Sequence, residues 1–302
     1  MSLLVTGSIG IDTVEAPSGK VVDAVGGSAV YFAYAASFFS PVRLVGVVGE
    51  DCPPGFLKPL EDNARIDLSG LEVRRGSKTF RWHGRYHSDV NNRDTVAVQL
   101  GVLGEKGPQI PACFRDSRYI FLANSHPELQ MEILGKLSDP GLVVADTMDL
   151  WINGERASLG KLLGSLDGLV LNDSEAKTLT GVGNLVEAGF AVLELGVRHF
   201  VVIKKGEHGS LLFLGDRVYP LPGYPSRRVV DPTGAGDSFA GAMMGHLAQA
   251  DKVDAATLRK AVAYGTVTAS IELEDFSLQA LMRATRDDIE TRMSDLRGSI
   301  DF

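Results

Sequence analysis

The sequence is poor in several features that mark special classes of protein. Only two of its 302 residues are cysteines, Cys52 and Cys113, and they form no Cys-x-x-Cys pair, so neither a disulfide framework nor a zinc site is expected. No apolar run approaches the ~20 residues that a membrane span needs, and the first residues lack the basic segment of a secretory signal. These absences predict a cytoplasmic protein that lies outside the membrane.

Positive charge is also scarce, with 30 Lys and Arg against 38 Asp and Glu and a formal net charge of −8. An acidic surface repels nucleic-acid phosphates and anionic lipids, so neither is expected as a main partner. The remaining composition, 44% hydrophobic and 23% charged, is that of an ordinary globular protein. We expect a single domain over residues 1–302, since the chain is long enough to bury one large core.

Short apolar runs alternate with helical patterns along most of the chain. They cover residues 3–5, 42–48, 117–123, 142–145, 168–171 and 201–203. After residue 236 the pattern becomes mostly helical, over residues 237–250, 254–271 and 278–296. Apolar strands separated by helices predict an α/β fold with a doubly wound, mostly parallel sheet covered on both faces. Ligands bind such a sheet at the carboxyl ends of its strands, where this chain carries Asn124, Asp146 and Asn172.

Two stretches have a different pattern, residues 11–25 and residues 77–100. In the second, aromatic residues alternate with basic or imidazole residues: Phe80, Trp82 and Tyr86 with Arg81, His83, Arg85 and His87. Alternation with a period of two predicts β-strands paired as an antiparallel hairpin, not strands of a parallel core. We therefore expect these two stretches to form a small β-sheet lid attached to the main domain.

The strongest local pattern is Asp-Pro-Thr-Gly-Ala-Gly-Asp-Ser-Phe at residues 231–239. Its glycines let the backbone approach a phosphate and turn N–H groups toward it. A helix that begins at Asp237 adds free amides and the positive end of its dipole. The pattern predicts an anion hole for phosphoryl transfer, with a carboxylate suited to accept a proton from a hydroxyl. For a shorter glycine turn, an aspartate that merely caps a helix would be the common alternative.

This nonapeptide resembles the second signature of the ribokinase-like, or pfkB, family of carbohydrate and nucleoside kinases. Other segments resemble further parts of that family between the first strand and Ile271: residues 7–12, the pair Gly26-Gly27, residues 44–51, the Asn-x-x-Glu motif at 172–175 and the nucleotide loop at 205–209. The resemblance implies a ribokinase-like fold with a β-lid over the substrate. It also implies MgATP as the phosphoryl donor.

The resemblance further implies roles for single residues. Asp237 would be the general base, and the anion hole would be formed by Gly234, Ala235 and Gly236. The substrate would contact Asp12, Gly26, Gly27 and Asn124. The nucleotide would contact Asn172, Lys204, Gly206, Gly209 and Tyr264. Mg2+ would be organised, through water, by Asn172 and Glu175, and a monovalent cation such as K+, which some members bind, would lie at Asp231 and Thr233.

Three departures from the family pattern leave the substrate open. Tyr31 stands where family sugar kinases often have an asparagine, Lys204 stands where a threonine is usual, and residues 272–276 replace a glycine-containing run near the adenine. A small sugar or sugar derivative is the first expectation. A nucleoside is the alternative, since Tyr31 could stack on a base. A non-catalytic binding protein on the same fold is disfavoured because the residues of phosphoryl transfer are all present.

The two faces of the lid lead to further expectations. The aromatic residues form an apolar face together with Val96, Val98 and Leu100. Such a face is too large to leave in water, and the resemblance suggests that it pairs with the lid of a second subunit in a homodimer. The basic face could overhang the pocket and favour an anionic substrate, or it could be a solvated outer surface. The opposite orientation, with the aromatic residues over the substrate, is also consistent with the pattern.

Overall fold

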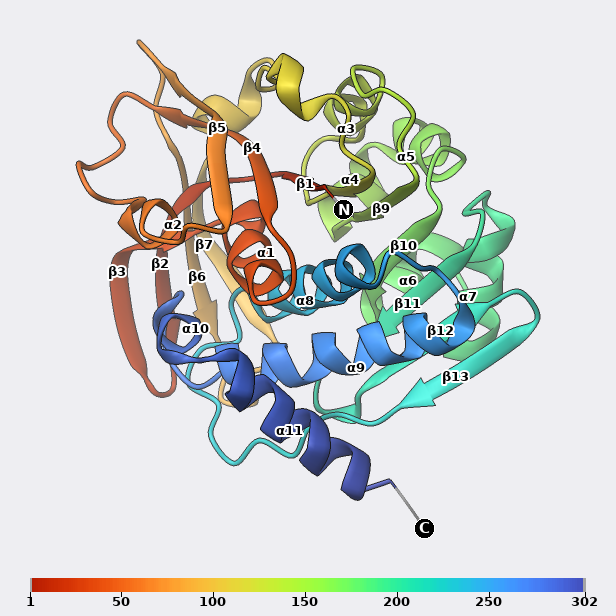
Figure 1. Cartoon of the computed structure of the whole chain (residues 1–302). Helices are drawn as coiled ribbons and strands as arrows, with labels where there is room; N and C mark the ends of the chain where they lie inside the picture. The colour runs from red at the N-terminus through yellow and green to blue at the C-terminus, as the bar shows by residue number, and fades with distance from the viewer. Residues whose placement is uncertain (1, 301–302) are drawn as a thin grey trace.

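The short apolar runs form the centre of a nine-stranded sheet (Figure 1). The structure is a computed structural model and describes residues 2–300. The strand order is β13-β12-β11-β10-β9-β8-β1-β4-β5, in which neighbours from β11 to β5 are parallel and β12 and β13 form an antiparallel edge. The strands are β1 Leu3–Thr6, β4 Val42–Gly49, β5 Ile66–Arg74, β8 Tyr119–Leu122, β9 Leu142–Asp146, β10 Gly168–Asn172, β11 Phe200–Lys204, β12 Ser210–Leu214 and β13 Arg217–Leu221.

Helices cover both faces of this sheet. One layer contains α1 Ser28–Ser37, α8 Ala235–Ala250, α9 Ala255–Glu272, α10 Gln279–Arg283 and α11 Arg286–Gly298, and α8 and α9 lie side by side within it (Figure 1). The other layer contains α3 Pro127–Leu134, α4 Asp149–Gly154, α5 Arg156–Leu163, α6 Asp173–Thr180 and α7 Leu185–Glu194. Leu3 and Val5 pack in the first layer and Leu4 in the second, because successive side chains of a strand point to opposite faces. The expected doubly wound fold is confirmed.

The elements at the margins differ from the sequence prediction. The helix expected over residues 278–296 is two helices, because Ala284 is extended and Thr285 caps a new helix by accepting from the Asp288 amide. Strand β5 and the hairpin of β12 and β13 were not predicted. Residues of β5 are mostly polar or exposed, as expected for an edge strand, so they form no apolar run. Between residues 2 and 300 no helix is both long and apolar enough to cross a bilayer.

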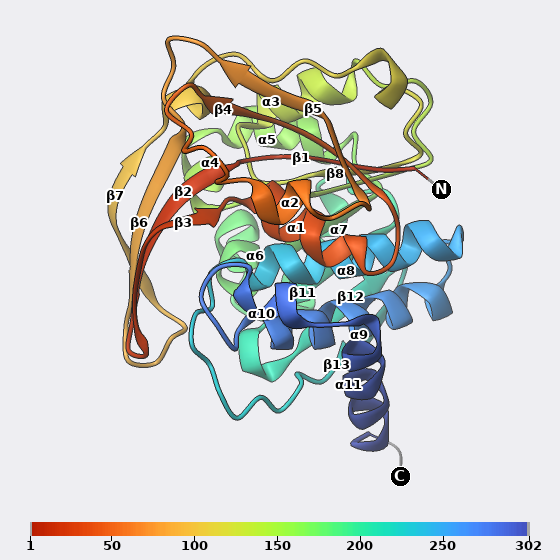
Figure 2. The same cartoon turned by 60° about the vertical axis from the view of Figure 1, so that its left-hand side comes forward.

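A second, four-stranded sheet forms the expected lid. Its order is β3-β2-β6-β7, with β2 Gly10–Ala16, β3 Gly19–Gly26, β6 Phe80–Tyr86 and β7 Arg93–Gln99. The hairpin of β6 and β7 is antiparallel, as predicted, whereas β2 and β6 are parallel, so the lid is a mixed sheet. Figure 2 shows it as a curved sheet beside the main domain. The short helix α2 Lys58–Glu61 precedes β5.

Candidate active site

The nonapeptide forms the loop before α8 and the first residues of that helix, and close contacts constrain the loop backbone. Gly234 has a φ of 85°, in the left-handed region, and a Cβ at this position would enter the ring of Tyr31. A Cβ on Gly236 would lie 2.6 Å from Nζ of Lys204. Gly234 therefore requires glycine, whereas at Gly236 only the flexible end of the Lys204 side chain would have to move. The loop is enclosed between an aromatic ring and an ammonium group. The helix begins at Ala235, so Ala235 and Gly236 supply amides of its first turn.

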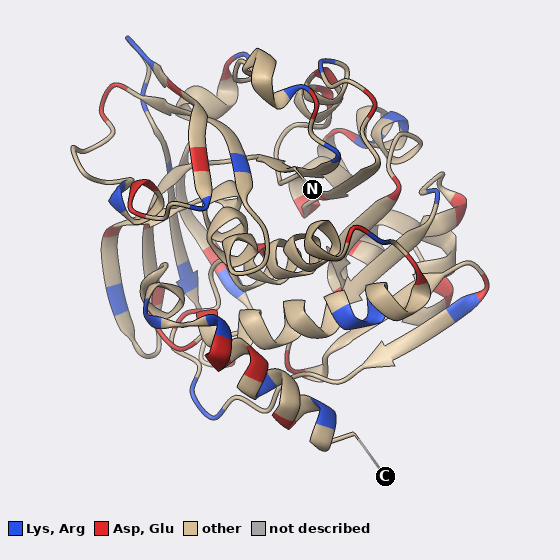
Figure 3. Ribbon diagram, in the orientation of Figure 1, with Lys and Arg blue, Asp and Glu red and all other residues tan. Residues whose placement is uncertain are grey.

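Asp237 lies in the same first turn and is the only Asp, Glu, Lys or Arg of α8 (Figure 3). Amides in the first turn of a helix have no partner within the helix and can bind an anion. Burial raises the pKa of Asp237, and Lys204 and then Arg93 oppose this rise. A carboxylate with a raised pKa is a better proton acceptor than ordinary aspartate, provided that it remains ionised at the working pH. The first turn of α8 thus places a buried carboxylate beside backbone amides that have no partner within the helix.

The carboxyl ends of three parallel strands bring further polar residues to this loop. Asp146 ends β9, Asn172 ends β10 and Lys204 ends β11. Burial raises the pKa of Asp146, Glu175 and Asp237, and Lys204 opposes the rise in all three. One lysine therefore lies within electrostatic range of three carboxylates and directly against the glycine loop.

Asp146 lies within electrostatic range of Asp237, Lys204 and Glu175; the sequence placed it at the ligand-binding edge of the sheet but in no motif. Its side chain is buried, and its Oδ1 has no hydrogen-bond partner among the described residues. Burial, and after it the charge of Asp237, raises its pKa well above the ordinary value. An acidic residue that ends an apolar run was the only signal available in the sequence.

Asn172 and Glu175 form a reciprocal capping box at the start of α6. The Asn172 amide donates to Oε2 of Glu175 at 2.7 Å, and the Glu175 amide donates to Oδ1 of Asn172 at 2.8 Å. Capping, the ordinary function of such a pair, is therefore present. The box also buries Glu175, and Lys204 lies within electrostatic range of its carboxylate as it does of that of Asp237.

Asp12 in β2 lies within electrostatic range of Asp231 and Asp237 of the glycine loop and α8. A Cβ on Gly26 would overlap its carboxylate, and Gly27, with a φ of 100°, could not carry a Cβ without meeting the Ser8 carbonyl. The expected glycine pair thus makes room for the Asp12 side chain. Its Oδ1 is buried and has no hydrogen-bond partner within the described chain. Burial, then Asp231 and Asp237, raises the pKa of Asp12 to about 7.

Tyr31 is buried beneath the loop, with 2% of its surface exposed. Its ring fills the space against Gly234, so it packs on the loop and does not offer an open face to a nucleobase. Burial raises the pKa of its phenol well above the ordinary value, and Asp12 and Glu272 add to the rise. The stacking contact that the sequence suggested for Tyr31 is therefore absent from this arrangement.

Asp231 and Thr233 lie at the start of the same loop. The Thr233 amide donates to Oδ1 of Asp231 at 2.9 Å, while Oδ2 is buried without a partner within residues 2–300. Glu272, at the end of α9, is fully buried, and neither carboxylate oxygen has a partner there. Burial, then Asp231 and Asp237, raises the pKa of Glu272 well above its usual range. Among the described residues, no three His, Cys, Asp or Glu side chains are placed to hold a metal ion by themselves.

The predicted nucleotide and substrate residues do not all gather at the loop. Gly206 and Gly209, with φ of 55° and 80°, form the tight connection that follows β11 and Lys204. Asn124 lies two residues after the end of β8, as expected. Its side chain is engaged within the protein: Oδ1 accepts from Trp151 Nε1 at 2.8 Å, and Nδ2 contacts Met148 Sδ at 3.1 Å.

Tyr264, which the resemblance placed at the nucleotide, lies among core residues in the structure. It lies in the middle of α9 with 3% of its surface exposed. Its ring packs against Phe39 and His246, and its hydroxyl donates to Glu290 at 3.0 Å. Since His246 and Glu290 belong to α8 and α11 and Phe39 follows α1, Tyr264 is a core residue between helices and does not border the glycine loop.

The aromatic face of the lid points toward the main domain. The Thr233 hydroxyl donates to the Tyr86 hydroxyl at 3.1 Å, which joins β6 to the glycine loop. Trp82 is paired in register with Asp12, so both side chains lie on this inner face, and the indole covers Gly84. Of the orientations left open by the alternating pattern, the structure has the aromatic residues over the site.

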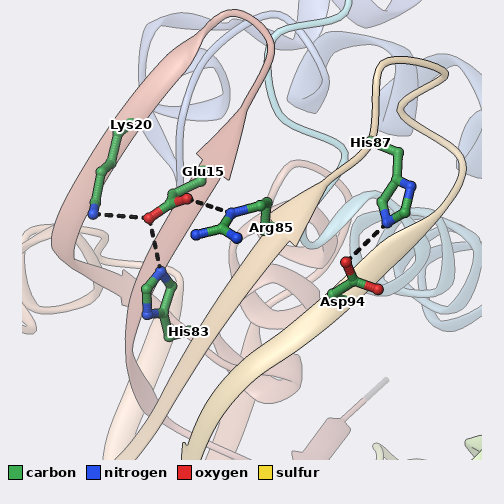
Figure 4. A network of polar contacts seen from close by, with 6 residues as sticks. All are labelled: Glu15, Lys20, His83, Arg85, His87 and Asp94. Atoms are coloured by element: carbon green, nitrogen blue, oxygen red, sulfur yellow. Dashed lines mark hydrogen bonds and ion pairs between the residues drawn. The ribbon is translucent and has the colours of Figure 1, made fainter.

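The basic residues of β6 lie on the outer face and are paired with carboxylates (Figure 4). Glu15 accepts from Arg85 at 2.6 Å and from Lys20 at 2.9 Å, and it contacts His83 at 3.1 Å. Arg85, and after it Lys20, lowers the pKa of Glu15 to about 2. In the same way Arg81 pairs with Asp23 and His87 with Asp94. This row is neutralised on the outer surface and does not overhang the glycine loop.

The sequence is similar to those of known kinases. The pfkB family carbohydrate kinases match residues 142–285. A cytidine kinase of Thermococcus kodakarensis is 30% identical over 249 residues, which cover 81% of this chain and 87% of the relative. A ribokinase of Arabidopsis thaliana is 27% identical over 248 residues, which cover 76% of this chain and 63% of the relative.

Solved structures with the same fold include a nucleoside kinase and a ribokinase. A nucleoside kinase of Burkholderia thailandensis in complex with inosine has a TM-score of 0.78 and 21% identity, covering 98% of this chain and 99% of that chain. A ribokinase of Cryptococcus neoformans in complex with ADP has a TM-score of 0.79 and 21% identity, covering 96% of this chain and 99% of that chain. At these identities the likeness establishes the fold alone.

Proposed function

This chain belongs to the pfkB family of carbohydrate kinases and is a phosphotransferase that acts on an alcohol group; we propose that ATP is its donor and Asp237 its general base. The observation that carries this proposal is the placement of Asp237 in the first turn of α8, directly after Gly234 and Gly236 and within range of Lys204. Free amides, a cation and a proton acceptor at one point are what phosphoryl transfer to a hydroxyl requires.

The chemistry follows from these placements. The free Oδ1 of Asp12 accepts a hydrogen bond from a substrate hydroxyl and orients the substrate. Asp237 accepts the proton of the reacting substrate hydroxyl. At the same time the hydroxyl oxygen bonds to the γ-phosphorus of ATP, and the bond from the γ-phosphorus to the β-phosphate oxygen breaks. The amides around Gly234, Ala235 and Gly236, with Lys204, stabilise the negative charge on the transferred group. ADP then leaves with the electron pair of the broken bond.

The residues present fit two metal ions, although Asn172 Oδ1 and Glu175 Oε2 already accept hydrogen bonds in the capping box. Asn172 and Glu175 would hold Mg2+ through water, since no all-protein cage exists in the described chain and Mg2+ usually keeps several waters. When bound with the nucleotide, Mg2+ would neutralise phosphate charge. Asp231 Oδ2, buried without a described partner, together with Thr233 would hold K+.

A nucleoside is the substrate class that these observations favour. The cytidine kinase similarity covers 87% of that relative, and Trp82 places an aromatic surface beside the substrate-binding Asp12. A free sugar such as ribose is the second candidate, because the chain is also similar to a ribokinase. ADP release with MgATP should be measured for cytidine, other nucleosides, ribose, other sugars and sugar phosphates. Highest kcat/KM for a nucleoside supports the first candidate, and highest kcat/KM for a free sugar supports the second. No phosphorylation of any alcohol would contradict the proposed function.

We also propose that the lids of two subunits form a homodimer. All seven residues of β7 are exposed, and Val96 and Val98 are 45% and 52% exposed on this unpaired edge. An exposed edge strand with apolar residues readily pairs with another strand. Val96→Lys should dissociate the dimer in multi-angle light scattering. Val22→Lys, on the opposite lid edge, supplies a control that should remain dimeric. A Val96→Lys protein of unchanged dimer mass would exclude β7 as the interface.

A further inference from the structure

Glu272, the last residue of α9, is a buried carboxylate that the proposed reaction does not use. Its side chain is fully buried, and neither carboxylate oxygen has a hydrogen-bond partner between residues 2 and 300. An unpaired carboxylate in a protein interior is strongly unfavourable unless another group satisfies it. The described chain supplies no such group, which indicates a ligand from outside the chain.

A second buried carboxylate lies next to Glu272. Asp231 is also fully buried, and its Oδ2 has no partner in the same part of the chain. The backbone holds the two segments together, because the amides of Val230 and Asp231 both donate to the Leu273 carbonyl, at 2.7 and 3.3 Å. After burial, the charge of Asp231 is the largest cause of the raised pKa of Glu272. Three unpaired carboxylate oxygens therefore gather where the end of α9 meets the glycine loop.

No lysine or arginine of the described chain neutralises this pair. Lys204 opposes the rise in the pKa of Asp237, so that carboxylate has a cation within range. For Glu272, burial and its acidic neighbours all raise the pKa, and no cation opposes them. For Asp231, only hydrogen bonds from Thr233 and Ser277 oppose the rise in pKa that burial causes. The positive charge that would balance this pair is therefore not provided by a side chain.

A proton on Glu272 would remove its charge but not its need for partners. A protonated carboxyl group carries one O–H donor and one carbonyl acceptor, and both would stay buried without a described partner. A hard cation instead contacts both oxygens at once, as glutamate does when it binds calcium through its two oxygens. The arrangement therefore fits a cation better than a proton.

The two carboxylates also decide the charge of the ion. Asp231 and Thr233 alone supply one negative charge, which suits K+. With Glu272 the position carries two, and a divalent cation neutralises both, whereas K+ leaves one buried charge unbalanced. The Thr233 hydroxyl donates to the Tyr86 hydroxyl at 3.1 Å, so the lone pairs of its own oxygen remain free for the ion.

We propose that Glu272 and Asp231 together bind a divalent cation that is separate from the Mg2+ accompanying the nucleotide. K+ would occupy the same position more weakly. The inference rests on the proposed function, which places a cation at Asp231 and Thr233, and it adds a ligand that changes the selectivity of that position. Because Asp231 belongs to the loop that leads into α8, the ion would fasten the end of α9 to the backbone that forms the anion hole.

The first test measures ion binding without nucleotide or acceptor. The protein is stripped with a chelator, and its Tm is recorded by scanning calorimetry with added Ca2+, Mn2+ or K+. For wild type, Ca2+ and Mn2+ should raise Tm at concentrations at least ~10-fold below the K+ concentration of equal effect, since affinity follows the charge of the ligands. Glu272→Gln keeps the shape of the side chain and should weaken the apparent Kd for Mn2+ at least ~10-fold.

Glu274→Gln is the matched control. Glu274 lies in the same segment, but its carboxylate forms an ion pair with Arg292 at 2.6 Å. Its rise in Tm with Mn2+ should equal that of wild type, even where its Tm without ions is lower. A Glu272→Gln protein with the wild-type response to Mn2+ would overturn the inference, as would a wild-type protein whose Tm responds only to K+ or to no ion.

Direct counting of the ion makes the test independent of unfolding. After incubation with Mn2+ and desalting, wild type should retain stoichiometric Mn2+ by elemental analysis, and Asp231→Asn should lose it to the same degree as Glu272→Gln. Glu175→Gln should retain it, because the site is separate from the nucleotide Mg2+. Loss of Mn2+ from Glu175→Gln but not from Glu272→Gln would overturn the inference. None of these measurements uses an acceptor, so their failure leaves the proposed function intact.

Discussion

Asp12 offers a prediction in which stability and activity change in opposite directions. The side chain is 4% exposed, and burial, then Asp231 and Asp237, raises its pKa from 3.8 to about 7. Below pH 3.8 the group is protonated in both the folded and the unfolded chain, so it has no effect on the free energy of unfolding. As the pH rises from 3.8 to 7, the unfolded chain releases the proton first, and the folded protein loses stability.

The size of this loss follows from the pKa difference. Each pKa unit corresponds to ~1.4 kcal/mol, so the cost to the folded state is about 2 kcal/mol at pH 5 and about 4 kcal/mol at pH 8. Asp12→Asn keeps the shape of the side chain and removes the titration. The variant should be more stable than wild type by these amounts, while KM for the substrate rises because the hydroxyl loses its carboxylate acceptor.

Denaturant unfolding of wild type and Asp12→Asn at pH 5 and pH 8 measures the effect directly. Asp23→Asn, in the same lid and largely exposed, makes the same chemical change outside the buried cluster and should alter stability little at either pH. The reasoning is refuted if Asp12→Asn gives the same stability difference at pH 5 and pH 8, or if it destabilises the protein at pH 8.

Three further predictions concern the phosphoryl site. Asp237→Asn should lower kcat at least ~10²-fold with little change in nucleotide affinity, since a positioned base contributes 10²–10⁴-fold; near-wild-type kcat in a folded variant would remove Asp237 as the base. Lys204→Met should lower kcat/KM for ATP by about 10–100-fold, the scale of a charge-assisted hydrogen bond. The control Lys205→Met changes the next residue in the chain and should leave kcat/KM unchanged. Equal effects of both substitutions would contradict a specific contact of Lys204 at Gly236. Glu175→Gln can keep the capping box and should raise the Mg2+ concentration for half-maximal rate, and an unchanged Mg2+ dependence would leave capping as its sole function.

Local patterns in the sequence were sufficient for the centre of the main sheet, from β11 to β4, and for the lid and the glycine loop. Apolar runs such as residues 42–48 and 168–171 identify strands because burial on both faces demands continuous apolar side chains. The backbone of Gly234 needs a glycine for its positive φ, and this requirement is written in the residue type itself. Where a strand is half-exposed, as in β5, the apolar run disappears, and the strand was missed.

Only the tertiary structure decided which residues share the site and which face of the lid covers it. Period-two alternation separates Phe80, Trp82 and Tyr86 from Arg81 and Arg85, but it is equally consistent with either face turned inward. The contact that settles the orientation joins Tyr86 to Thr233, which is 147 positions away in the chain. Three residues near Asp237 lie in no motif. Folding buries the carboxylates of Asp146 and Glu272, and it brings the positive charge of Arg93 within range of Asp237. Electrostatic coupling depends on distance and burial in three dimensions, and spacing along the chain specifies neither.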